Sequence, residues 1–164
     1  MTNKKQLLQK DVMGRDVAIQ ELNRWMDLME VPEEDRIDID ESDDELKDEA
    51  KEKSDIMRER CIKAIMKGRL KVDEEGKMSY DIKHPLTGQD SGTVLLDKVE
   101  FKVRYREIDL KINMKGIDTD NHEEMAIAYI ATITGKGKHL IGKLYNTDMD
   151  VLKAVYTVFT RGDA

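Results

Sequence analysis

The residues best suited to chemistry lie in two short segments, one rich in carboxylates and one rich in glycine and lysine. In residues 38–49, carboxylates occupy several ligand positions of a calcium-binding EF-hand loop. Asp43, however, stands where that loop needs glycine for its sharp turn, and Glu45 stands where an apolar anchor belongs. A charged linker that leads into a helix is therefore favoured over a calcium site.

Residues 137–143, Gly-Lys-His-Leu-Ile-Gly-Lys, match the beginning of a phosphate-binding P-loop. Leu144 then stands where a Ser or Thr would hold magnesium. The motif also requires a preceding buried strand, whereas residues 125–132 carry the apolar spacing of a helix. A coincidental match is favoured over a nucleotide site.

Other catalytic and metal-binding patterns are weak. His84, His122 and His139 are scattered, and none has a metal-ligand spacing to another histidine or to Cys61. The chain has no nucleophile elbow, paired-cysteine motif or dinucleotide fingerprint. With 35 Asp and Glu residues, no particular acid–base pair can be selected. We therefore expect a non-enzymatic protein without catalytic residues, cofactor or metal.

Composition limits the class of partner. Charged residues make up 38% of the 164 residues and aromatic residues 5%, so the core must use Leu, Ile, Val and the ten Met. Methionine is unbranched and fills irregular gaps, which predicts a small and adaptable core. The net charge of −7 repels phosphate backbones and anionic bilayers. Protein partners are expected, and nucleic acid and membranes are not.

The compartment is predicted from cysteine and from apolar runs. One cysteine cannot form an intrachain disulfide, which favours a reducing environment. The first residues, MTNKKQLLQKD, lack the apolar core of a secretory signal, and no apolar run approaches the ~20 residues that span a bilayer. A cytoplasmic location is expected, in the host cell if the chain is encoded by a phage.

The N-terminal part is predicted to be helical. Residues 11–30 place apolar side chains at spacings typical of one helix face. An acidic linker of about residues 31–44 follows. Ser42 and Glu45 then form a capping box, which predicts a second helix to about residue 67. We therefore interpret residues 1–67 as a helical arm that contains an acidic linker.

The remainder, residues 68–164, is predicted to be an α+β core domain. After Gly68 the apolar period changes from helical to alternating, which predicts a hairpin with its turn near Gly76. Val99, Phe101 and Val103 alternate with charged residues and predict a further strand. The expected fold is therefore α+β rather than parallel α/β, with two N-terminal amphipathic helices, a small antiparallel sheet and a C-terminal cluster of three to four helices.

The C-terminal cluster is predicted from apolar spacing and caps. Residues 108–114 suggest a short helix before Gly116, and residues 125–132 a second, capped by Asp120 or Asn121. A turn or two follows at residues 140–144. Thr147 or Asn146 is expected to cap the last helix, which carries Leu152 and ends at Phe159.

The order of these elements in residues 78–159 resembles that of the tail assembly chaperones of tailed bacteriophages. The similarity rests on an extended Tyr80–Leu86, a Gly92-Thr-Val turn, the strand pattern of residues 99–104, a helix from Met125 that ends in Thr-Gly, Ile141–Leu144, and Asn146-Thr-Asp-Met before the last helix. The resemblance implies a non-virion cytoplasmic protein. It would bind the long helical tape-measure protein, limit its aggregation and help recruit tail-tube subunits.

Three questions stay open at this level. The first 68 residues have no counterpart in the family's shorter members, so they either share the function or add a second binding surface. Homo-oligomerisation is also open. The alternatives to a chaperone are a structural or adaptor subunit of a phage particle, and an inhibitor of a host defence protein whose acidic surface mimics nucleic acid.

Eight side chains are predicted to form either the core or the surface that contacts a client. They lie on the apolar stripes of the predicted helices, where an adaptable apolar face suits varied partners. These residues are Trp25, Met26 and Met29 in the arm, and Tyr129, Leu144, Leu152, Tyr156 and Phe159 in the C-terminal helices.

Overall fold

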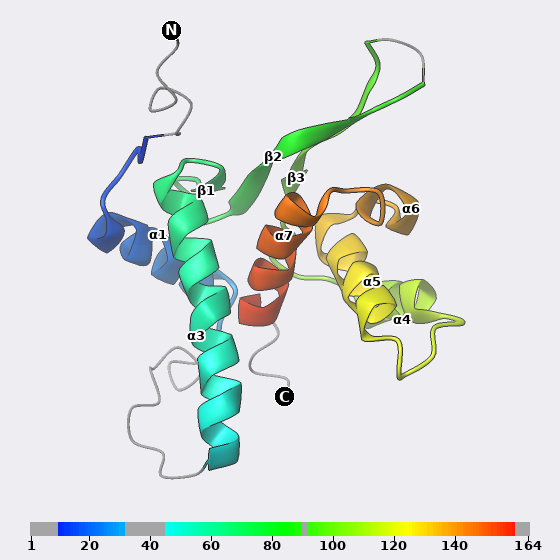
Figure 1. Ribbon diagram of the computed structural model, residues 1–164, viewed down its shortest axis with the longest axis horizontal. Coiled ribbons are helices and arrows are strands. Elements are labelled where there is room, and N and C mark those ends of the chain that lie inside the picture. Colours follow the sequence, from blue (N-terminus) through cyan, green and yellow to red (C-terminus); the bar gives the residue numbers. More distant parts are fainter. Residues whose placement is uncertain (1–9, 32–44, 90–91, 160–164) are drawn as a thin grey trace, which may run out of the picture.

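The computed structural model describes residues 10–31, 45–89 and 92–159, with the backbone alone for residues 45–53 (Figure 1). These residues form six helices and one three-stranded antiparallel sheet, so the fold is α+β, as the sequence predicts. In chain order the elements are α1 (Arg15–Leu28), α3 (Glu45–Met66), β1 (Leu70–Val72), β2 (Met78–Thr87), β3 (Val94–Glu100), α4 (Glu107–Met114), α5 (His122–Thr134), α6 (Lys138–Ile141) and α7 (Asn146–Phe159).

The two N-terminal helices form where the apolar spacing places them. The apolar stripe of α1 buries Ala18, Leu22, Trp25 and Met26, which lie on one helix face. The longer α3 packs against α1 and also against α7. It ends at Met66, and Gly68, two residues later, has a φ of 77° that suits the turn after a helix C-terminus. The predicted linker and the predicted cap Ser42 lie outside the described residues.

The sheet has the strand order β1-β2-β3, with β2 in the centre. Leu70 pairs with Tyr80, which confirms the predicted hairpin. The third strand ends earlier than its alternation suggests, at Glu100. Phe101 still donates its N–H to the carbonyl of Met78 at 2.9 Å, but the N–H of Lys102 donates to the carbonyl of Ile133 at 2.7 Å. The chain therefore leaves the sheet for the end of α5, and Val103 does not extend the strand.

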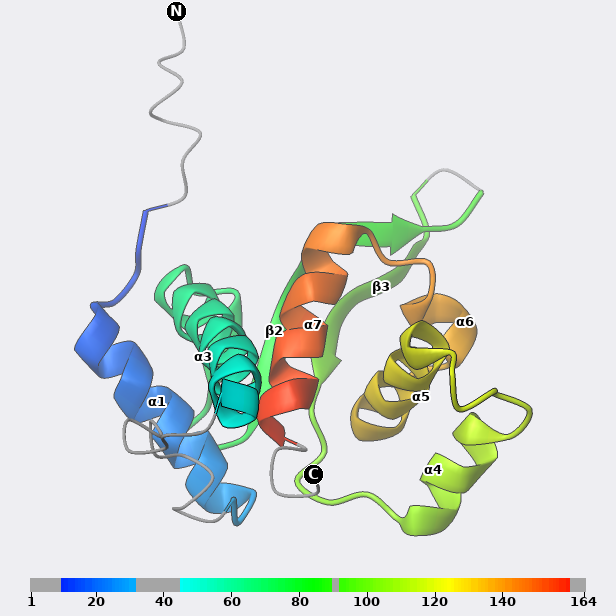
Figure 2. The same ribbon diagram turned by 60° about the horizontal axis from the view of Figure 1, so that its bottom comes forward.

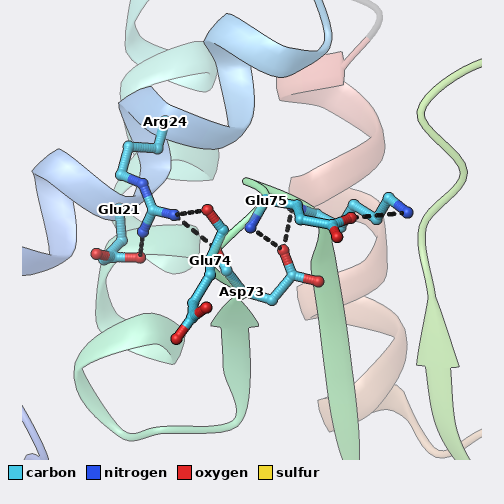
Figure 3. A network of polar contacts seen from close by, with 6 residues as sticks. Glu21, Arg24, Asp73, Glu74 and Glu75 are labelled. Carbon is cyan, nitrogen blue, oxygen red and sulfur yellow. Dashed lines mark hydrogen bonds and ion pairs between the residues drawn. The ribbon is translucent and has the colours of Figure 1, made fainter.

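The turn between β1 and β2 is seated on α1 (Figure 3). The Asp73 carboxylate accepts N–H bonds from Glu75 and Lys77, both at 2.9 Å, which closes the turn. The guanidinium of Arg24 in α1 donates to the backbone carbonyls of Asp73 at 2.6 Å and Glu74 at 3.1 Å. At Gly76, with φ of 87°, a Cβ would stand 3.3 Å from the Arg24 carbonyl oxygen. Both the positive φ and the lack of room for a Cβ therefore favour glycine at this position.

The C-terminal helices follow the predicted order. The Asn121 side chain accepts the N–H of Glu124 at 3.2 Å and caps α5, which ends at Gly135 with φ of 69°. The segment that resembles a P-loop therefore follows a helix, not a strand. The last helix begins at Asn146, so Asn146 and Thr147 lie within its first turn instead of capping it.

One continuous apolar cluster joins α1, α3, the sheet, α5 and α7. Both views place α7 between α3 and α5 (Figures 1 and 2), and α7 also packs against β2. The helices before residue 68 and the elements after it thus bury side chains against one another. The division into an arm of residues 1–67 and a core domain of residues 68–164 stays a prediction.

We predict that Gly76→Ala lowers the free energy of unfolding by about 2 kcal/mol, because it combines a positive φ with crowding against α1. Gly92→Ala is the matched control, since Gly92 also has a positive φ, 104°, but nothing within 4 Å of its Cβ position. Urea unfolding of both variants measures the difference. Equal losses would show that the approach of the turn to α1 contributes nothing.

Candidate functional site

A groove between α4 and α5 is the best candidate for a functional site. The two helices lie side by side at one edge of the molecule (Figure 2), and α4 packs mainly on α5. They enclose a pocket of about 270 Å³. We call it the α4–α5 groove, and it is lined by Glu107, Leu110, Lys111, Met114, Ile117, Thr119, Met125 and Tyr129.

Two contacts fix α4 beside α5 and so shape the groove. Leu110 is buried at 6% exposure and anchors the apolar side of α4. Asn113 supplies the polar contacts. Its side-chain amide donates to the Thr132 hydroxyl at 2.8 Å, and its backbone carbonyl accepts from the Lys138 ammonium at 2.7 Å. One residue of α4 is therefore bonded to both α5 and α6. The groove is held in place by this side chain and its backbone.

A second pocket of about 290 Å³ lies between α5, α6 and the loop that follows α4. Ile117 lines both pockets, so the two hollows meet at this residue. The second pocket is lined by Ile117, Glu124, Ile127, Lys138, His139 and Gly142. Most of the exposed surface in both pockets is apolar, and charged side chains such as Glu107, Lys111 and Glu124 also line them. Such a lining suits apolar side chains of another protein.

The eight residues predicted for the core or the contact surface divide between both roles. Trp25, Met26, Leu144 and Leu152 are buried in the core. Met29, Tyr129, Tyr156 and Phe159 are partly exposed and pack on the core or on each other. Among the eight, only Tyr129 lines the groove, and its ring lies 5.0 Å from that of Tyr156 on α7.

The sequence reasoning did not select the other apolar groove residues, Leu110, Met114, Ile117 and Met125. Each lies in or beside a short helix with only a few apolar positions, which gives a weak signal. The positions of Met114 and Met125, on either side of a short loop at Gly116, give a better indication of the groove. That pattern is typical of two antiparallel helices with a shared apolar seam.

Asp148 is the most unusual ionisable group in the described structure, because its carboxylate is 0% exposed. Oδ1 accepts from the Tyr80 hydroxyl at 2.7 Å and from the Lys83 N–H at 2.7 Å. Oδ2 accepts from the His84 N–H at 3.1 Å. Burial, together with the neighbouring carboxylate, raises the pKa of Tyr80 above its ordinary range.

The register of the sheet explains why a carboxylate lies there. Asp81 pairs with Lys98 and Leu86 pairs with Leu96, so residues 82–85 stand opposite Asp97 alone. Such a bulge takes backbone N–H groups out of the ladder. Asp148, in the first turn of α7, accepts two of them. Its three hydrogen bonds join the first turn of α7 to β2, which gives this buried acid a structural role.

The remaining candidates for chemistry are also accounted for. Burial raises the pKa of the Cys61 thiol to about 12, so the reactive thiolate is scarce near neutrality. Within the described residues, no group of three or more His, Cys, Asp or Glu is arranged to hold a metal. Most of the EF-hand-like segment lies outside them. Within the residues that the structure describes, no helix combines the length and apolar character needed to cross a bilayer.

Comparisons of the chain with protein-family models, with curated proteins and with solved structures find no match. Function is therefore inferred from the residues and the geometry of the chain itself.

We predict that Asp148→Ala lowers the free energy of unfolding by about 2 to 4 kcal/mol, because three donors lose a buried acceptor. Asp150→Ala is the matched control. It removes an exposed acid from the same end of α7 and should cost at most about 0.5 kcal/mol. Urea unfolding measures both. A loss below that of the control would contradict the structural role of Asp148.

Stability should also fall at alkaline pH. Because the folded state raises the pKa of Tyr80, its neutral form contributes stability that is complete below about pH 10 and is lost as pH rises further, by about 1.4 kcal/mol per pH unit. Cys61 adds a loss of the same sign. In a Cys61→Ala background, Tyr80→Phe should flatten the dependence of unfolding free energy on pH. An unchanged slope would mean that the Tyr80 hydroxyl ionises normally.

Proposed function

We propose that this chain is a non-enzymatic tail assembly chaperone of the phage type, which binds a helical client in the α4–α5 groove. The client would be the tape-measure protein, and the chain would help recruit tail-tube subunits around it in the host cytoplasm. The observation that carries the proposal is the Met-lined apolar groove between two helices.

The size and lining of the groove favour a protein client over a small substrate. Its volume of about 270 Å³ lies just below the range of about 300 to 1,000 Å³ typical of small-molecule sites. Met114 and Met125 contribute flexible thioether side chains, which adjust to different apolar partners. A holdase needs this kind of adaptable surface, because it must hold many similar segments of a long client.

The position of the groove also suits a helical client. It lies between two helices, and Glu107, Lys111 and Thr119 line it together with its apolar residues. An amphipathic helix docks in such a groove through side chains spaced three and four residues apart. The excess of acidic residues in the whole chain would keep the complex in solution.

One observation favours the alternative of a structural or adaptor subunit. The β2–β3 ribbon extends beyond the helices (Figure 1), and near its tip Val94 and Leu95 are 54% and 45% exposed. Ribbons of this kind can make permanent contacts between subunits of a particle. The inhibitor alternative depends on the acidic residues 38–44, which lie outside the described residues, and it stays a prediction.

We predict that the tagged protein, co-expressed with its neighbouring genes, recovers a long helix-rich protein of the tape-measure type. Met125→Glu should reduce this recovery at least about tenfold, because it places a charge in the groove. Val94→Glu is the control and should recover the client normally. Mass spectrometry of the eluted protein gives the readout, with thermal unfolding to confirm that both variants are folded.

Two results would overturn the proposal. If Met125→Glu retains the client, the groove is not its binding site. If the protein copurifies with finished particles and Val94→Glu abolishes that association, the chain is a structural subunit and the ribbon is its contact.

A further inference from the structure

The helix α4 has a second surface, on the side away from α5. Ile108, Lys111, Ile112 and Lys115 follow one another at spacings of three, one and three residues. With about 100° of rotation per residue, Ile108, Lys111 and Ile112 fall on one face of α4, and Lys115, the residue directly after the helix, follows at its C-terminal end. Leu110 and Asn113, which hold α4 against α5, point to the opposite side. We call the four residues the outer face of α4.

The outer face combines exposed apolar surface with positive charge. Ile108 and Ile112 are each 63% exposed, although aliphatic side chains of this size are usually buried. Lys111 and Lys115 are exposed beside them, and within the described residues no ion pair joins either lysine to a carboxylate. This is unexpected in a chain with a net charge of −7. Although the chain holds acids in excess, no carboxylate of the described residues forms an ion pair with these two lysines.

The part of the fold that the structure describes leaves this face exposed. In Figure 2, α4 lies at the periphery, with α5 as its neighbour and α1 and α3 far across the molecule. The groove described above uses a different side of the helix, where Leu110 and Met114 lie. Of the outer face, only Lys111 also reaches the groove. Occupation of one surface therefore does not require occupation of the other.

We propose that the outer face of α4 binds an acidic amphipathic helix of a protein partner. Two isoleucines one helical turn apart form a short ridge that fits between apolar side chains of a second helix. The two lysines on the same face then lie opposite Asp or Glu residues that flank the partner's apolar stripe. The two surfaces share Lys111 but otherwise use different residues of α4, so a single chain can present one side of the helix to the client and the other to the partner.

Charge and size favour this partner over a membrane surface. An anionic bilayer attracts a long basic amphipathic helix, but α4 has eight residues and two exposed isoleucines, and the whole chain is acidic. The long-range field therefore opposes approach to a bilayer. Contact with individual carboxylates of a partner helix needs only the local charge of Lys111 and Lys115.

The test uses two synthetic peptides of about 20 residues that form amphipathic helices with the same Leu stripe. One peptide carries Glu beside the stripe and the other carries Lys at the same positions. Fluorescence anisotropy with the full chain should show at least about tenfold tighter binding of the acidic peptide, and added salt should weaken it. Lys111→Glu/Lys115→Glu should reverse the preference between the peptides.

Matched variants separate this surface from the rest of the protein. Ile108→Ser/Ile112→Ser should weaken the acidic peptide at least about tenfold by removing the apolar ridge. Lys136→Glu/Lys143→Glu changes the net charge as much as the reversal on α4 but lies elsewhere, so it should retain the peptide preference. Met125→Glu should also retain it, which distinguishes a failure of the groove from a failure of this surface.

Three outcomes would overturn the inference. The first is equal binding of the two peptides. The second is a control charge reversal that changes the preference between the peptides as strongly as the reversal on α4. In the third, the protein would bind vesicles of anionic phospholipid through Ile108 and Ile112 while showing no preference between the peptides. That outcome would assign the outer face of α4 to a membrane instead.

Discussion

The position of α7 depends on one buried carboxylate. Asp148 accepts a hydroxyl bond from Tyr80 and two backbone bonds from the bulge of β2, so it joins the start of the last helix to the central strand. A buried acid is tolerated only when it is hydrogen-bonded, and here Tyr80 and the bulge supply the donors. Because α3 and α5 both pack on α7, this junction also sets how far apart the two helical sides of the molecule lie.

Periodicity predicted the elements that obey local rules. The stripe of Leu22, Trp25 and Met26 predicted α1, and the alternation around Gly76 predicted the hairpin, because each pattern reports burial on one side of a regular element. The bulge had no such signal. Residues 82–85 look like ordinary strand, and the acceptor for their N–H groups lies about 65 positions away, in the first turn of a helix where an acid is already expected from the helix dipole.

The candidate site was less accessible to sequence reasoning because apolar spacing does not distinguish a core stripe from a contact stripe. Leu152 and Ile112 occupy similar helical patterns, yet the first is fully buried and the second largely exposed. Half of the residues chosen from the sequence, Trp25 among them, are buried in the core, since large apolar groups gain most from burial. What distinguishes α4 is its place at the edge of the fold, and this depends on tertiary contacts such as that between Asn113 and Thr132.

The contact between Trp25 and Phe159 has a consequence for how the chain folds as it is made. Their rings lie 6.3 Å apart and join the first described helix to the last. Contacts between such distant positions form slowly, and they cannot form at all before α7 has left the ribosome. Until then α1 and α3 have no α7 to cover their apolar stripes. During synthesis the surface of α1 and α3 that faces α7 therefore stays exposed until the last helix has emerged.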